Sequence, residues 1–144
     1  MNCFKGVYMK KYNVIVVYNK DKKYILMCLR QKDPFQGLYN FVGGKVNPDE
    51  TDDEAAYREL YEETHISKQD IHLIHTHDFC YYLEDMMIQV YVGILSKDID
   101  VFGDENPLKW ISLEEDFFDV TRFAGLGNIG HILKSIALNQ NKLI

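Results

Sequence analysis

One stretch of this 144-residue chain decides its fold and indicates its chemistry: residues 43–66, with the sequence GGKVNPDETDDEAAYRELYEETHI. It places a glycine loop directly before a predicted helix that carries Glu59, Glu62 and Glu63. Positions i, i+3 and i+4 of a helix lie on one face, so these three carboxylates crowd together and repel one another. A cation neutralises such a cluster, and Mg²⁺ takes carboxylate oxygens together with waters and substrate phosphates. The stretch therefore predicts metal-assisted phosphate chemistry.

Thr51 and Glu54 predict where this helix begins. They form a capping box, in which the threonine side chain accepts from the amide three residues on and the glutamate reaches back to the threonine amide. The acidic residues of the first turn also suit the helix dipole. We therefore expect a helix over residues 52–64.

Apolar and β-branched runs on both sides of this helix predict a sheet. We expect strands over residues 13–18, 23–30, 39–42, 71–83, 86–95 and 109–112. A second helix is expected over residues 128–138, where apolar residues recur at helical spacing. Strands and helices do not alternate strictly, which favours an α+β fold with a mixed β-sheet sandwiched between α-helices. The length predicts one domain, residues 1–144.

Composition and charge exclude several classes of protein. The chain is 47% hydrophobic and 26% charged, which is ordinary for a folded domain. Its net charge of −6 argues against coating a nucleic-acid polymer, and its apolar runs are too short to cross a bilayer. The three cysteines, Cys3, Cys28 and Cys80, form no CxxC pair. We expect free thiols, buried at Cys28 and Cys80, and a cytoplasmic location.

The spacing within the opening stretch resembles the signature of the Nudix hydrolase family. Gly44 is followed by five residues, Glu50, seven residues and then the run RELYEETHI at residues 58–66. Every specified position matches except one, where His65 stands in place of the family's glycine. The order of the flanking strands is also similar to the Nudix fold, so the resemblance implies a single Nudix hydrolase domain.

The resemblance implies roles for the acids of the helix. Glu59, Glu62 and Glu63 would be catalytic residues that bind Mg²⁺, with Mn²⁺ as the alternative ion. Gly43 would offer its backbone carbonyl to the metal, because glycine lets the backbone come close.

The resemblance also implies supporting residues. Arg58 would pair with the glutamates, since its planar fork suits carboxylates, while Gly44 and Glu50 would brace the loop and the helix. His65 is expected to take the left-handed conformation that follows a helix end, at a cost of about 1–2 kcal/mol, and not to bind metal.

Four more residues are candidates, three of them outside the box. Glu105 sits where MutT-type Nudix enzymes place an extra glutamate, so it either binds metal or activates water, or it belongs to an acidic solvent loop. Asn128 either reads a purine edge, as a similar asparagine does in those enzymes, or caps the last helix. Tyr39 either stacks on a base or packs in the core, and Lys45 could meet a phosphate.

The resemblance implies Mg²⁺-dependent hydrolysis of a nucleoside diphosphate-linked substrate. The first expectation is a nucleoside triphosphate, including one with an oxidised purine, that is cleaved to a monophosphate and pyrophosphate. Mg²⁺ would neutralise the phosphoanhydride charges that repel an incoming water. The alternatives are a dinucleoside polyphosphate, a nucleotide sugar, or a non-catalytic module that senses a nucleotide. We expect a small-molecule nucleotide as partner, no nucleic-acid polymer, no membrane, and a monomer or homodimer.

Overall fold

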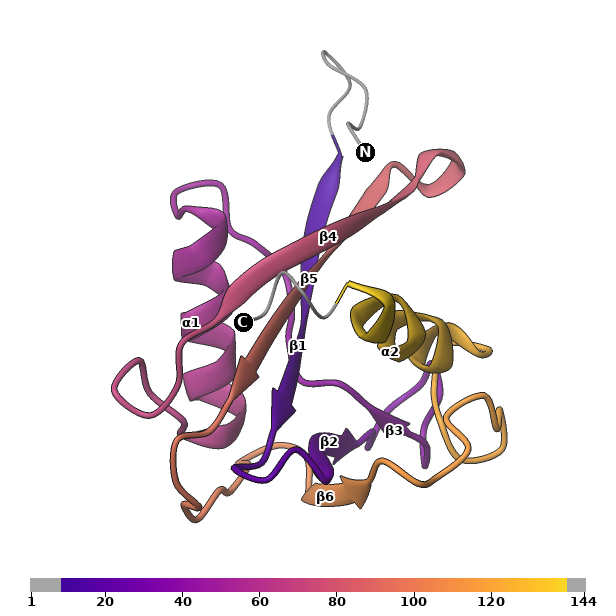
Figure 1. Ribbon diagram of the computed structural model, residues 1–144. Helices are drawn as coiled ribbons and strands as arrows, with labels where there is room; N and C mark the ends of the chain where they lie inside the picture. Colours follow the sequence, from indigo (N-terminus) through magenta and orange to yellow (C-terminus); the bar gives the residue numbers. More distant parts are fainter. Residues whose placement is uncertain (1–8, 140–144) are drawn as a thin grey trace.

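A mixed β-sheet forms the centre of the protein (Figure 1), whose computed structural model describes residues 9–139. Its strands are β1 (Lys10–Tyr18), β2 (Tyr24–Leu29), β3 (Tyr39–Asn40), β4 (Ile74–Tyr81), β5 (Met86–Ile94) and β6 (Leu108–Ser112). They follow the order β3-β2-β1-β5-β4, and β6 pairs with β2. The long strands β1 and β5 are parallel, whereas the other pairs are antiparallel.

Two helices cover opposite faces of the long strands (Figure 1): α1 (Asp52–Thr64) and α2 (Asn128–Leu138). Successive residues of a strand point to opposite faces of its sheet. Ile15 and Val17 accordingly share a buried cluster with the α1 residue Leu60, while Val16 belongs to the cluster that contains Ile132 of α2. The predicted α+β sandwich is confirmed.

Helix α1 begins and ends as its sequence predicts. Thr51 Oγ1 accepts from the Glu54 amide at 3.1 Å, and Glu54 Oε1 accepts from the Thr51 amide at 2.9 Å. At the other end His65 is left-handed, with φ 66° and ψ 13°, and its amide donates to the carbonyl oxygen of Tyr61. His65, which stands at the glycine position of the family signature, thus has the left-handed conformation predicted for it.

The strand predicted over residues 71–83 is shorter in the structure. The amide of Leu73 donates to the hydroxyl of Tyr57 in α1 at 2.9 Å and not to a neighbouring strand. Ile71 and Leu73 are apolar because they pack in the cluster on the α1 face. At the other end of β4 a short 3₁₀ helix, η1 (Tyr82–Glu84), replaces the last predicted strand residues. The strand predicted over residues 39–42 is likewise only two residues long, followed by an isolated bridge from Val42 to Ile15.

The cysteines agree only in part with the prediction. Cys28 is a buried free thiol, as expected. Cys80 is disulfide-bonded, so the expectation of a free thiol there was wrong. Cys3 lies outside the described residues.

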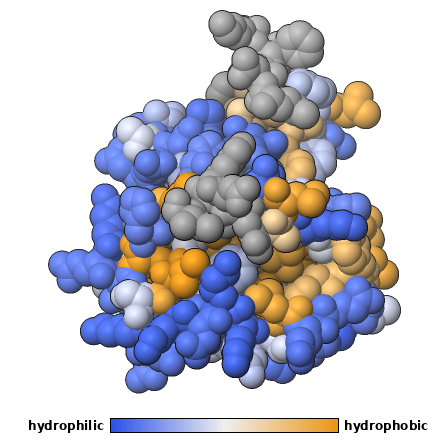
Figure 2. Space-filling view, viewed as in Figure 1, coloured by the Kyte–Doolittle hydropathy of each residue, from blue (hydrophilic) through white to orange (hydrophobic). Residues whose placement is uncertain are grey.

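The two sides of the molecule differ in polarity. Hydrophilic residues prevail on the side of α1 in the space-filling view, whereas apolar residues gather on the side of α2 (Figure 2). Exposed apolar side chains of α2 and the loop before it are Phe118, Val120, Leu126 and Leu138. Within residues 9–139, no helix has the length and apolar character needed to cross a membrane.

Replacing Thr51 with alanine removes one of the two hydrogen bonds of the capping box, the one that the threonine hydroxyl accepts. We expect the Thr51→Ala variant to lose about 1 kcal/mol of unfolding free energy, because the Glu54 amide loses its acceptor. Urea unfolding followed by circular dichroism measures this loss. Ser96→Ala, at an exposed bend, is the control and should change stability by less than about 0.5 kcal/mol. Equal losses in the two variants would contradict the prediction.

Candidate active site

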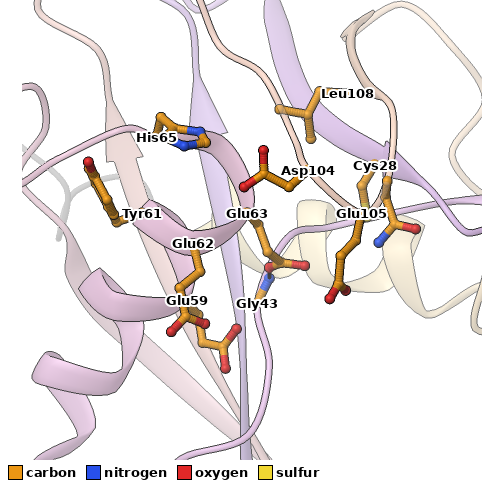
Figure 3. Close-up of a pocket in the computed structure, with 11 residues that line it drawn as sticks. Cys28, Gly43, Glu59, Tyr61, Glu62, Glu63, His65, Asp104, Glu105 and Leu108 are labelled. Atoms are coloured by element: carbon orange, nitrogen blue, oxygen red, sulfur yellow. Dashed lines mark hydrogen bonds between the residues drawn. The ribbon is translucent and has the colours of Figure 1, made fainter.

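A cavity of about 620 Å³ opens beside the C-terminal half of α1 (Figure 3). Among the described residues, five carboxylates line it: those of Glu59, Glu62, Glu63, Asp104 and Glu105. The first three come from α1, and the last two come from the loop before β6. The structure therefore brings together acids that are about forty positions apart in the sequence.

Glu63 is held at the backbone of Gly43. The Gly43 amide donates to Glu63 Oε2 at 2.6 Å, and Figure 3 shows the carboxylate next to this glycine. The pKa of Glu63 is raised from its ordinary value of 4.5 to about 7, chiefly by burial and then by the negative charges of Glu59, Glu105 and Glu62, against the lowering effect of the Gly43 bond. The site is therefore strongly acidic and short of positive charge.

The two adjacent glycines leave room for this arrangement. A Cβ at Gly44 would lie 2.5 Å from the carboxylate of Glu59, so any side chain there would displace that group. Gly43 has φ 142°, and a Cβ on it would lie 2.2 Å from the carbonyl oxygen of Asn13. The glycine loop therefore lets the backbone approach both the helix and β1.

Arg58 uses all five of its N–H groups in this region. Its Nε and Nη2 donate to the two carboxylate oxygens of Glu50 at 2.9 and 2.7 Å. Its Nη1 donates to Glu59 at 3.0 Å and to Glu62 at 3.2 Å, and Nη2 also donates to the carbonyl oxygen of Lys45. These bonds to Arg58, and one from the Asn47 amide, lower the pKa of Glu50 to about 2. One guanidinium thus links the loop before α1 to two acids of the helix.

The other predicted site residues lie elsewhere. The side chain of Lys45 is exposed, and Tyr39 is half-buried against the cluster on the α2 face. Asn128 is exposed in the first turn of α2 and does not cap it, because the N-cap is Gly127, with φ 96°. None of these three lines the acidic cavity.

Several residues that line the cavity were not predicted from the sequence. Asp104 precedes Glu105, so the acidic pair was itself a signal. His65 follows Glu62 by three positions, about one helical turn, so helical spacing could have placed it at the cavity, and Tyr61 also lines it. Cys28 reaches the cavity from β2, which only the sheet topology reveals.

The donor set fits a hard divalent cation in its chemistry. Carboxylate and backbone oxygens are the ligands that such ions prefer, and the raised pKa values of Glu59 and Glu63, caused first by burial, mark charges that a cation would stabilise. Within residues 9–139, no three His, Cys, Asp or Glu side chains already converge as ligands. The side chain of Glu62 is 57% exposed, so it has room to turn toward a bound ion.

The sequence pattern of the NUDIX domain matches residues 9–123, most of the chain. The chain therefore belongs to the Nudix family. It is a pyrophosphohydrolase of nucleotide-linked substrates, and enzymes of this family generally use a divalent metal. No curated protein matches the chain.

Three solved structures illustrate the likeness of fold. A MutT structure from a study of the Aliivibrio salmonicida and Vibrio cholerae proteins is 22% identical, with a TM-score of 0.65, over 90% of this chain and 98% of that chain. An Ap4A hydrolase from C. elegans is 22% identical, with a TM-score of 0.68, over 91% of this chain and 99% of that chain. A MutT/nudix family protein from Enterococcus faecalis is 22% identical, with a TM-score of 0.63, over 81% of this chain but only 48% of its own length.

The stability of the metal-free protein should depend on pH through Glu63. Its folded-state pKa of about 7 exceeds its ordinary value of 4.5, so the folded state keeps a proton that the unfolded state releases. The free energy of unfolding therefore falls as the pH rises from 4.5 to about 7 and then levels off. Urea unfolding in EDTA across this range should show a smaller fall for Glu63→Gln. An equal fall in the variant would exclude Glu63 as the cause.

Replacing Arg58 with lysine should disorganise the box even though the charge is kept. Lysine offers three donors from one point and cannot bridge Glu50, Glu59 and Glu62 together. We expect a loss of about 1–3 kcal/mol in unfolding free energy and of about 10–100-fold in nucleotide hydrolysis. Arg122→Lys, in the exposed pair with Glu115, is the matched control and should change stability by less than about 1 kcal/mol. Equal effects of the two changes would contradict the prediction.

Proposed function

We propose that the protein hydrolyses a nucleoside triphosphate to a monophosphate and pyrophosphate with the help of Mg²⁺. The observation that carries the proposal is the acidic cavity, in which the glutamates of α1 face Glu105 beside a glycine backbone. A bound cation would stabilise such a cluster of carboxylates. A triphosphate also needs a divalent cation to neutralise its charges during hydrolysis. The fold shared with MutT supports this substrate class.

The proposed roles follow from where each group lies. Glu59, Glu62 and Glu63 would hold the ion, with the Gly43 carbonyl as a further ligand and Mn²⁺ as a possible substitute. A bound divalent ion supplies charge neutralisation of the phosphates and a more acidic water. Glu105, on the opposite loop, would either add a ligand or take the proton of the attacking water.

Arg58, Glu50 and Gly44 would keep these acids in place. Arg58 orders the acids through the bonds described above, and Glu50 anchors it from the loop. Gly44 leaves the space that the Glu59 carboxylate occupies. These three residues therefore support the box without contacting the scissile bond.

Base recognition is proposed for positions outside the acidic cavity. Asn128 could bind a purine edge because it is exposed and does not cap α2. Tyr39 could stack on a base and Lys45 could meet a phosphate. A dinucleoside polyphosphate is the second candidate, since an Ap4A hydrolase shares the fold. A nucleotide sugar is the remaining alternative substrate. The single domain over residues 1–144, the monomer or homodimer and the cytoplasmic location stay predictions.

A panel of nucleoside triphosphates, dinucleoside polyphosphates and nucleotide sugars, incubated with Mg²⁺, tests the proposal by product release. We expect turnover of a triphosphate, abolished by EDTA and restored by Mg²⁺. The hydrolysis rate of the Glu62→Gln, Glu63→Gln double variant should fall more than about a hundredfold, because stabilisation of charge by the metal is worth several kcal/mol.

The matched control for this double variant is Glu84→Gln with Glu114→Gln, two exposed glutamates that do not line the acidic cavity, and it should keep full activity. A lack of turnover of every substrate in the panel would refute the proposed function. Turnover that survives the Glu62 and Glu63 changes would refute the metal site.

A further inference from the structure

His65, at the end of α1, contacts the loop that carries Glu105. Its Nδ1 lies 3.0 Å from the carbonyl oxygen of Phe102, and its ring stacks on the Phe102 ring with centroids 4.1 Å apart. Because a carbonyl oxygen only accepts, Nδ1 must carry the proton and donate it. The amide of Phe102 also donates to the carbonyl oxygen of Thr64 at 3.3 Å. Two consecutive residues at the end of α1 therefore hold the start of this loop.

Gly103 brings the same loop against the last turn of the helix. A Cβ at this position would lie 3.0 Å from the carbonyl oxygen of Glu63 and 2.4 Å from that of Asn106. Only a glycine permits both approaches. The next two residues, Asp104 and Glu105, then line the acidic cavity (Figure 3).

Electrostatic repulsion opposes this position of the loop. Glu59, Glu62 and Glu63 line the same cavity, and the charge of Glu105 contributes to the raised pKa of Glu63. Like charges in a partly buried site destabilise one another. The contacts between α1 and Phe102 must therefore offset this repulsion if Glu105 is to stay beside the helix.

We propose that His65 is a positioning residue that fixes the Glu105 loop on the end of α1. The proposal rests on the proposed function, because it assumes that Glu105 acts in hydrolysis. The glycine that the family signature places here has neither a ring nor a side-chain donor, so it could make neither contact with Phe102. The left-handed backbone of His65 is the conformation that this position requires, and its side chain adds the link to the loop.

Three single variants test the proposal. His65→Gly removes both side-chain contacts and keeps a residue that suits positive φ. Phe102→Ala removes the stacked ring from the loop side and leaves the helix end unchanged. Lys22→Gly is the matched control, because Lys22 has φ 57° in the turn between β1 and β2, outside the cavity. Each variant is compared with the wild-type protein by amide hydrogen exchange of residues 101–107 and by kcat and KM with Mg²⁺.

Both His65→Gly and Phe102→Ala should speed exchange in residues 101–107 about tenfold or more, and Lys22→Gly should not. Both should lower kcat by about 10–100-fold with little change in KM, which is the size of effect that outer-shell partners show. In a Glu105→Gln background the His65→Gly change should lower kcat little further, because residues that act through one another are not additive.

Unchanged exchange in residues 101–107 would overturn the proposal. So would an equal kcat loss from His65→Gly with and without Glu105, or a Glu105→Gln variant with wild-type kcat. If the wild-type protein hydrolyses no nucleotide in the panel, the proposed function fails, and the exchange measurement alone then decides whether His65 holds the loop. The two failures are thereby distinguishable.

Discussion

Repulsion among clustered carboxylates is the constraint on which the rest of this site depends. Helix α1 presents Glu59, Glu62 and Glu63 on one face, and isolated in water such a face would weaken the helix. The protein surrounds it with positive partners: the guanidinium of Arg58 and the amide of Gly43. These partners offset only part of the repulsion. The negative charge that remains would attract a divalent cation, and that cation would in turn bind a polyphosphate.

The two faces of the sheet carry different groups of residues. Its α1 face carries the acids, and its α2 face carries the apolar cluster with which Tyr39 packs. In the proposed function, the acidic cavity would define the kind of bond that is cut, and positions such as Tyr39 and Asn128 would recognise the base. MutT and an Ap4A hydrolase share this fold, because a fold does not by itself fix the substrate.

Local sequence determined most of the fold and the central part of the site. The capping box, the spacing of the three helix acids and the left-handed residue at position 65 depend on neighbours within one or two turns, and all three were predicted correctly. The ends of α1 and α2 match their predicted residues, and strands were expected in the right order. Patterns of this kind are readable because the physical cause and the residue lie close together in the chain.

Tertiary structure decided the features that join distant segments. The amide of Leu73 leaves the sheet because the hydroxyl of Tyr57 accepts from it, and local patterns carry no trace of that contact. The place of Glu105 beside the acids of α1 likewise depends on the contact between His65 and Phe102, thirty-seven positions apart. By itself the sequence determined a capped, acid-bearing helix after a glycine loop. Only the folded chain decided what faces that helix, because the packing of separate segments sets which loop can lie against it.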